Sequence, residues 1–254
     1  MGIVALLVIV MNMKTALVTG VSKGIGEAVA QLLLENNWKV YGVSRNRPVT
    51  PHDNLVWLQS DLTNPSAIAA ITKQIAEKNI DLLVSNAGVA FQELASLTTS
   101  ASYRKMFDLN VLAPMLLVSE LKDKIETSTI ISISSVSDRI AENDFALYCS
   151  SKAANTRYFE SLAKDLNRAK VYTLLPDYVD TPMLRVLQEG GDFNWEETMS
   201  AMDVADLCLQ FADEVILAPS GSNIIIVNNA LIGDLDSVEQ LFGYNTDTKA
   251  LTRL

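Results

Sequence analysis

Seven apolar runs, rich in β-branched residues, alternate along the chain with stretches whose apolar residues recur at helical spacing. Most of the runs are apolar without a break, which is typical of strands that are buried on both faces of a sheet. Because a helical crossover returns each connection to a face of the sheet, neighbouring strands run parallel and helices cover both faces. The sequence therefore predicts an α/β fold with a doubly wound, seven-stranded parallel sheet. The expected strands span residues 15–20, 39–44, 55–61, 80–88, 129–135, 170–176 and 223–229.

The domain organisation follows from the absence of internal repeats, low-complexity tracts and linkers in the 254 residues. A chain of this length and composition can bury one large core, so we expect a single domain over residues 13–254. Within it, Asn64 before Pro65 predicts a capped helix start. Two parts stand outside the regular alternation: residues 181–202, expected to form a lid, and a C-terminal tail over residues 231–254.

Residues 1–12 form an apolar leader that is too short to span a bilayer, which needs roughly 20 apolar residues. The leader also lacks the positive segment and the small-residue cleavage site of a secretory signal. Two interpretations stay open. The leader is either an upstream translation start, with Met13 opening the functional protein, or a short apolar arm that packs on a neighbouring subunit.

The charge and the scarcity of histidine exclude several kinds of function. A formal net charge of −10 repels phosphate backbones and anionic lipid, so we expect neither nucleic acid nor membrane as a partner. His52 is the only histidine, which excludes histidine-based metal sites and Ser–His–Asp triads, and no metal is expected. Cys149 and Cys208 have no metal-ligand spacing, and we interpret them as two reduced thiols of a cytoplasmic protein.

A glycine-rich turn follows the first expected strand and leads into a helix: Thr19-Gly20-Val21-Ser22-Lys23-Gly24-Ile25-Gly26. Glycine permits positive φ at such a turn, and further glycines let the backbone approach a pyrophosphate. The phosphates would then face the helix N-terminus, where free N–H groups and the helix dipole favour anions. The G-x3-G-x-G spacing differs from the common GxGxxG fingerprint, so a simple tight turn is the alternative interpretation.

The end of the second expected strand indicates which dinucleotide fits. A site for NAD usually places an acid near this point to bind the ribose 2′-hydroxyl, but there is no Asp or Glu between Glu35 and Asp53. Arg45 stands there instead, next to Ser44, and Lys23 lies within the glycine turn. Two cations suit a 2′-phosphate, which a guanidinium can bind bidentately. We therefore predict NADPH/NADP as the cofactor.

Tyr148 and Lys152 are candidate catalytic residues because a pair four residues apart shares one face of a helix. A nearby ammonium favours the phenolate, which eases proton transfer by a group whose pKa is otherwise near 10. A surface pair is the alternative, but this helix follows the fifth strand and faces the same sheet edge as the glycine turn. Ser135 ends that strand, where its hydroxyl could donate to a substrate oxygen. A serine-rich strand exit is the alternative for Ser135.

Taken together, these motifs resemble the single-domain short-chain dehydrogenase/reductase family, and the resemblance covers about Met13 to Gly233. It rests on the order and the spacing of short motifs: residues 19–26, Asp61-Leu62, Asn86-Ala87-Gly88, Asn110, Ser135, Tyr148-x-x-x-Lys152 and residues 176–183. The resemblance implies a Rossmann-type fold and an NADP(H)-dependent oxidoreductase. It also implies a homodimer or homotetramer, in which residues 100–122 and 148–167 pair between subunits.

The resemblance also implies roles for four catalytic residues. Tyr148 would donate the proton during reduction, and Lys152 would hold the nicotinamide ribose and lower the pKa of the tyrosine. Ser135 would orient the substrate oxygen, and Asn110 would anchor a water that relays protons to Lys152.

For the cofactor, the resemblance places Asp61 at the adenine amino group, Asn86 to Gly88 under the adenosine ribose, and Thr181 at the nicotinamide carboxamide. The complete predicted cofactor-binding set is Thr19, Gly20, Ser22, Lys23, Gly24, Ile25, Gly26, Ser44, Arg45, Asp61, Leu62, Asn86, Ala87, Gly88, Tyr148, Lys152, Pro176, Val179 and Thr181.

The chain departs from the family pattern in two places. Asp177 replaces the glycine that commonly follows Pro176, which puts an acidic side chain near the nicotinamide. Residues 227–230, Val-Asn-Asn-Ala, replace the frequent Val-Asp-Gly-Gly, so close kinship with the tetrameric fatty-acid ketoacyl reductases is not expected.

The predicted activity is hydride transfer from NADPH to a small ketone or aldehyde. Apolar residues of the expected lid, among them Met183, Leu184 and Leu187, favour a hydrophobic substrate, although a helix packing its apolar side on the domain is an equal interpretation. Two other functions stay open: an alcohol dehydrogenase that works oxidatively with NADP or NAD, and a non-catalytic NADPH-sensing protein.

Overall fold

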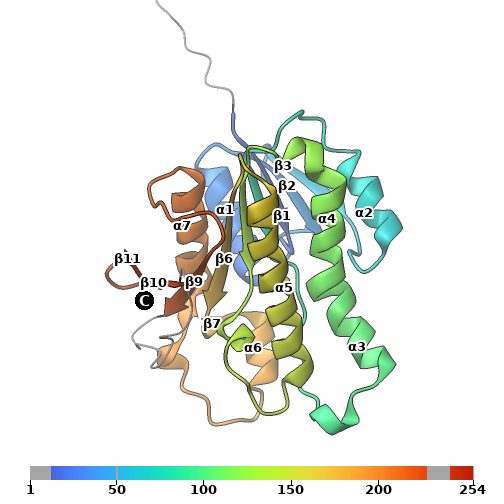
Figure 1. Ribbon diagram of the computed structural model, residues 1–254, viewed down its shortest axis with the longest axis vertical. Coiled ribbons are helices and arrows are strands. Elements are labelled where there is room, and N and C mark those ends of the chain that lie inside the picture. Colours follow the sequence, from blue (N-terminus) through green and yellow to red (C-terminus); the bar gives the residue numbers. More distant parts are fainter. Residues whose placement is uncertain (1–12, 50, 228–240, 254) are drawn as a thin grey trace, which may run out of the picture.

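The computed structural model describes residues 13–49, 51–227 and 241–253. Its main sheet has the strand order β11-β10-β9-β6-β5-β4-β1-β2-β3, and all of these strands are parallel except β11 (Figure 1). All seven predicted strands are present, which confirms the doubly wound α/β fold. They are β1 (Thr15–Thr19), β2 (Lys39–Ser44), β3 (Leu55–Gln59), β4 (Leu82–Ser85), β5 (Thr129–Ile133), β6 (Lys170–Pro176) and β9 (Ser222–Val227).

Helices cover both faces of this sheet, and α1 and α7 lie side by side on one of them (Figure 1). The helices are α1 (Gly24–Glu35), α2 (Pro65–Thr72), α3 (Ser100–Phe107), α4 (Ala113–Leu121), α5 (Ala146–Asp165), α6 (Pro182–Leu187) and α7 (Ala201–Ala212). A π-helical turn over Asp108–Leu112 joins α3 to α4. The predicted cap of α2 is confirmed, because Asn64 Oδ1 accepts a hydrogen bond from Ser66 N at 3.0 Å.

The core consists of two apolar layers, one on each face of the sheet. Ala16 and Val18 of β1 pack in the layer of α1 and α7, whereas Leu17 between them packs in the layer of α2, α4 and α5. Successive side chains of a strand point to opposite faces, so a strand that is covered on both sides is apolar at most of its positions. This explains the unbroken apolar runs of the sequence.

The C-terminal tail adds two strands that the sequence analysis did not predict, β10 (Leu241–Asn245) and β11 (Ala250–Arg253). Strand β10 pairs with β9, and Tyr244 is fully buried in the core layer of α7. Its hydroxyl accepts a hydrogen bond from Gln210 Nε2 at 3.2 Å, and Lys249 forms an ion pair with Asp203 at 3.3 Å. The tail from residue 241 onward is therefore part of the sheet. Its first ten residues lie outside the described part of the chain, as does the leader of residues 1–12.

Three further observations bear on the sequence analysis. No helix in the described part of the chain is long and apolar enough to cross a membrane. Cys149 and Cys208 are both free thiols. Thr181 caps α6 within the segment expected to form a lid, and short strands β7 (Val179–Asp180) and β8 (Met199–Ser200) pair at its two ends.

Candidate active site

The predicted site residues gather at the carboxyl ends of the central strands, where the strand order reverses around β1. Two adjoining cavities lie at this edge. The glycine-turn cavity, of about 230 Å³, is bounded by the turn after β1 and by the ends of β2 and β4. The tyrosine cavity, of about 250 Å³, lies beside the ends of β5 and β6. The two cavities share Ile25, Asn86, Thr181 and Met183, so they form one continuous crevice. Crevices at this edge are where open α/β sheets bind their ligands.

The glycine turn has the backbone conformation that its residues predict. Gly20 and Gly24 have φ of +79° and +65°, in the left-handed region that favours glycine. At Gly26 a Cβ would collide with the Asn86 amide and lie 2.5 Å from the Gly20 carbonyl oxygen. The turn can pack this tightly against β4 only because these positions carry no side chain. Helix α1 starts directly behind it, and Lys23 at its N-cap makes no side-chain capping hydrogen bond.

Thr19 and Gly26 belong to the predicted cofactor-binding set but line neither of the two cavities. Thr19 Oγ1 accepts hydrogen bonds from the backbone N–H groups of Asn86 and Ala87, both at 2.9 Å. Asn86 Nδ2 in turn donates to the Thr19 carbonyl oxygen at 2.8 Å. Thr19 therefore fixes the loop after β4 to the glycine turn, and it supports the shape of the glycine-turn cavity without lining it.

Most of the other predicted cofactor residues line the glycine-turn cavity. They are Gly20, Ser22, Lys23, Gly24, Ile25, Ser44, Arg45, Asp61, Leu62, Asn86, Ala87, Gly88 and Thr181. The two cations, Lys23 and Arg45, are both exposed at its wall. The Ser44 hydroxyl is less available to bind a cofactor, because it donates to the Asn46 carbonyl oxygen at 2.7 Å and accepts from Trp57 Nε1 at 3.1 Å.

The carboxylate of Asp61 is held in place by Thr63. Its Oδ1 accepts from the Thr63 backbone N–H at 3.0 Å and from the Thr63 hydroxyl at 2.8 Å. These hydrogen bonds, with a smaller contribution from the Arg45 charge, hold the pKa of the Asp61 carboxyl below its ordinary value. Asp61 thus presents a fixed carboxylate at the wall of the glycine-turn cavity.

Ser135, Tyr148 and Lys152 all line the tyrosine cavity, together with Pro176, Val179 and Thr181. Tyr148 and Lys152 lie one turn apart on α5, as their spacing predicts. The Lys152 ammonium is buried, lies 5.6 Å from the centroid of the Tyr148 ring and donates to the Ile133 carbonyl oxygen at 3.0 Å. Three of the four side chains that were predicted to be catalytic therefore meet in one cavity.

The electrostatics of this trio differ from the expectation in one respect. Burial raises the pKa of Tyr148 to about 12, and the hydrogen bond with Ser135 only partly offsets it. The expected direction was downward, but the Lys152 ammonium lies over the ring and bonds to the backbone. Burial also lowers the pKa of Lys152 to about 8, against the opposing charge of Asp138. Near neutral pH the phenol therefore keeps its proton.

Asn110 lies in the π-helical turn and lines neither of the two cavities. Its Oδ1 accepts from Val89 N at 2.8 Å, and its Nδ2 donates to the Val89 carbonyl oxygen at 2.9 Å and to Ser151 Oγ at 3.0 Å. The Asn110 carbonyl oxygen accepts from Asn155 Nδ2 at 3.0 Å. In the structure Asn110 joins the loop after β4 to α5, through Val89 on one side and Ser151 and Asn155 on the other.

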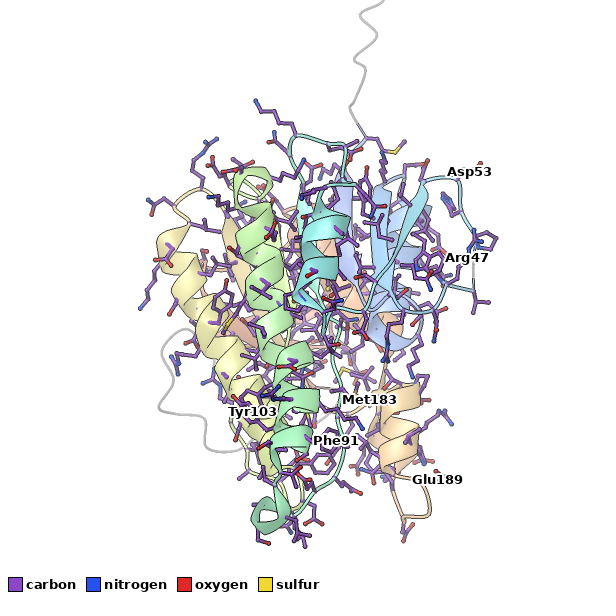
Figure 2. The ribbon with its side chains drawn as sticks, turned by 90° about the vertical axis from the view of Figure 1, so that its right-hand side faces the viewer. Arg47, Asp53, Phe91, Tyr103, Met183 and Glu189 are labelled. Atoms are coloured by element: carbon purple, nitrogen blue, oxygen red, sulfur yellow. The ribbon has the colours of Figure 1, made fainter. Side chains whose placement is uncertain are left out.

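The segment over residues 181–202 contributes Met183, Leu184, Leu187 and Gln188 to the tyrosine cavity. Met183 lies at the end of α6 that meets the body of the domain, and Glu189 lies beyond its opposite end (Figure 2). Val186 is 70% exposed and points away. The cavity wall thus has the apolar character that the sequence suggested.

Several cavity residues were missed by the sequence analysis. Glu142 and Phe145 stand between Ser135 and Tyr148, and Tyr178 follows Asp177. Glu142 and Phe145 belong to no recognisable motif, and their only signal in the sequence is that they stand between two catalytic residues. Tyr178 lies within the motif of residues 176–183, but it was not singled out there.

The fold is that of a Rossmann-type α/β protein. Residues 14–191 match the short chain dehydrogenase family. The short-chain dehydrogenase virD of Hypocrea virens is 32% identical over 227 residues, which cover 82% of this chain and 74% of that protein. The NADP-dependent (R)-specific alcohol dehydrogenase of Lentilactobacillus kefiri is 24% identical over 238 residues, with 84% and 94% covered.

Among solved structures, a short chain dehydrogenase family protein from Francisella tularensis aligns with a TM-score of 0.77 and 26% identity, covering 84% of this chain and 96% of that one. The chain therefore belongs to the short-chain dehydrogenase/reductase family, whose members are oxidoreductases.

Proposed function

We propose that this protein reduces the carbonyl group of a small ketone or aldehyde with NADPH. The observation that carries the proposal is the single crevice in which Ser135, Tyr148 and Lys152 adjoin the glycine turn. A proton donor and a cofactor cradle in one crevice are the two parts that such a reduction requires.

The glycine-turn cavity fits a dinucleotide phosphate. The backbone of the turn is free of side chains where a pyrophosphate would approach, and α1 begins behind it with uncapped N–H groups. Lys23 and Arg45 would hold the 2′-phosphate, and Asp61 would accept from the adenine amino group. When bound, NADPH supplies a hydride.

The chain's own residues would handle the proton and the substrate oxygen. Tyr148, which keeps its proton near neutral pH, donates it to the carbonyl oxygen as negative charge develops there. Ser135 orients that oxygen from the same cavity wall. Lys152 holds ribose hydroxyls, and its positive charge stabilises the phenolate that remains after proton transfer.

A panel of carbonyl compounds, scored by the consumption of NADPH, tests this function. The panel should include aliphatic, alicyclic and aromatic ketones and aldehydes, since the tyrosine cavity is mostly apolar. Consumption that depends on both the carbonyl compound and the enzyme supports the proposal. The absence of consumption with every compound, while NADPH binds, argues for a non-catalytic role.

Arg45→Ala should raise the dissociation constant of NADPH about tenfold and leave that of NADH almost unchanged. The two nucleotides differ only by the 2′-phosphate, and Arg45 is exposed, so we expect the lower end of the range for a charge-assisted hydrogen bond. The effect of Arg45→Ala on the dissociation constant of NADPH should shrink as the salt concentration rises. Fluorescence titrations with both nucleotides, at low and high salt, measure these dissociation constants.

Arg47→Ala is the matched control for this experiment. Arg47 stands two residues away, is exposed, and lies 5.8 Å from the Trp57 ring without lining either of the two cavities (Figure 2). The Arg47→Ala substitution should leave the dissociation constants of both NADPH and NADH unchanged. Equal weakening of NADPH and NADH by Arg45→Ala would contradict the assignment of the 2′-phosphate.

We also propose that the chain forms homodimers or homotetramers in the cytoplasm. Tyr103 and Leu112, which are 48% and 40% exposed, leave apolar surface on residues 100–122, the segment expected to pair between subunits.

A further inference from the structure

The tyrosine cavity contains two carboxylates that the proposed reaction does not use. Glu142 and Asp177 come from segments far apart in the sequence, the loop before α5 and the residue after β6, and both line the cavity. Lys152 is the only cationic side chain among the described residues of its wall. The Lys152 ammonium bonds to the Ile133 carbonyl oxygen, and no ion pair joins it to either carboxylate.

The charge of these carboxylates is not compensated within the described part of the protein. Burial raises the pKa of Asp177, and the nearby charges of Glu142 and Glu197 raise it further, whereas a backbone hydrogen bond with Tyr178, and no cation, acts in the opposite direction. Glu142 similarly raises the pKa of Tyr178. Glu142 accepts a hydrogen bond from Ser137, which fixes one of its oxygens but supplies no positive charge.

Aromatic and apolar side chains also line this cavity. Phe145 and Tyr178 lie in the same wall as the two carboxylates, together with Val136, Ile140 and Leu187. An aromatic face attracts a cation, and a carboxylate binds one more strongly when water is partly excluded. Carboxylates and aromatic rings at the wall of one apolar cavity are complementary to an ammonium group on a hydrophobic frame.

We propose that the substrate is a hydrophobic ketone or aldehyde that carries a positively charged ammonium group, which Glu142 and Asp177 recognise. This inference rests on the proposed carbonyl reductase function, and it narrows the substrate class that the apolar lid residues alone would suggest. Glu142 and Asp177 are then specificity-determining residues, and Tyr148 still protonates the carbonyl oxygen.

A shape-matched pair of ketones tests the inference. 4-(Trimethylammonio)cyclohexanone and 4-tert-butylcyclohexanone have the same outline, but only the first carries a charge, which does not depend on pH. With NADPH, the enzyme should show a kcat/KM about tenfold higher for the charged ketone, and added salt should reduce this preference.

Glu142→Gln and Asp177→Asn should each lower that ratio of kcat/KM values by about threefold or more. The Glu142→Gln variant keeps an oxygen that can accept from Ser137, so it removes the charge and not the hydrogen bond. Glu189→Gln is the control, because Glu189 is exposed beyond the far end of α6 and lies outside the cavity (Figure 2). It should leave the ratio unchanged.

Calorimetric binding of both ketones to the NADPH-saturated Tyr148→Phe protein separates this inference from the proposed function. Tighter binding of the charged ketone that Glu142→Gln and Asp177→Asn reduce supports the ammonium site, even if wild type reduces neither this pair nor any compound of the carbonyl panel, in which case the reductase function fails. Equal binding and equal kcat/KM values for the two ketones overturn the ammonium site while the reductase function stands.

Discussion

Replacing Tyr148 by phenylalanine should lower the turnover of carbonyl reduction by about 100-fold or more, the usual scale of general acid catalysis. The substitution keeps the aromatic ring in the tyrosine cavity and removes only the hydroxyl that faces Ser135. The glycine-turn cavity does not include Tyr148, so the dissociation constant of NADPH should stay within about twofold. Steady-state kinetics and a fluorescence titration measure the two quantities on the same protein.

Tyr158→Phe is the matched control for the Tyr148 experiment. Tyr158 lies on the same helix, is half-buried against Phe159, and lines neither of the two cavities. Its loss of a hydroxyl should leave turnover near that of wild type. If Tyr148→Phe retains more than about a tenth of wild-type turnover, the tyrosine is not the proton donor.

Tyr244→Ala should lower the free energy of unfolding by about 3–5 kcal/mol, as removal of a large buried aromatic side chain does. Tyr244 is fully buried in the core layer of α7, and it holds β10 against the rest of the domain. The substitution leaves a cavity and removes the hydrogen bond from Gln210, whose amide still donates to Asp206. Urea unfolding followed by circular dichroism measures the change.

Tyr244→Phe separates packing from hydrogen bonding in this experiment. It removes only the bond with Gln210 and should cost about 1 kcal/mol. A loss below about 1 kcal/mol for Tyr244→Ala would show that the C-terminal strands contribute little to the stability of the domain.

The parallel sheet could be predicted from the sequence because burial on both faces gives a strand an almost continuous apolar run. Strand β1, with every residue buried, reads as an apolar run in the sequence, and the other six predicted strands follow similar patterns. Strands β10 and β11 carry no such signal. Gly243 interrupts the apolar pattern of β10, Asn245 ends it, and a tight turn at residues 246–249 joins β10 to β11 in place of a helical crossover. Long-range contacts hold these strands: β10 pairs with β9, Tyr244 is buried in the core, and Lys249 forms an ion pair with Asp203. No local pattern reveals such contacts.

The candidate site was predictable where function depends on short-range spacing. The glycine turn and the Tyr148–Lys152 pair are local patterns, because backbone conformation and the helical repeat fix them. The walls of the tyrosine cavity are not local. Glu142 and Asp177 meet only when the loop before α5 packs beside the end of β6. The shift in the pKa of Tyr148 could not be predicted from the sequence for the same reason, because burial by the surrounding residues decides whether the pKa rises or falls.

The transfer of deuterium from NADPH to the product tests the central claim most directly. The enzyme would be supplied with NADPH deuterated at either face of nicotinamide C4 and with the carbonyl compound that it reduces fastest. We predict that one of the two labelled nucleotides places deuterium on the former carbonyl carbon of the alcohol. The Tyr148→Phe protein should form this alcohol at a rate that is lower by about 100-fold or more. An alcohol without deuterium from either nucleotide, or no alcohol at all while NADPH remains bound, would contradict the assignment of this chain as an NADPH-dependent carbonyl reductase.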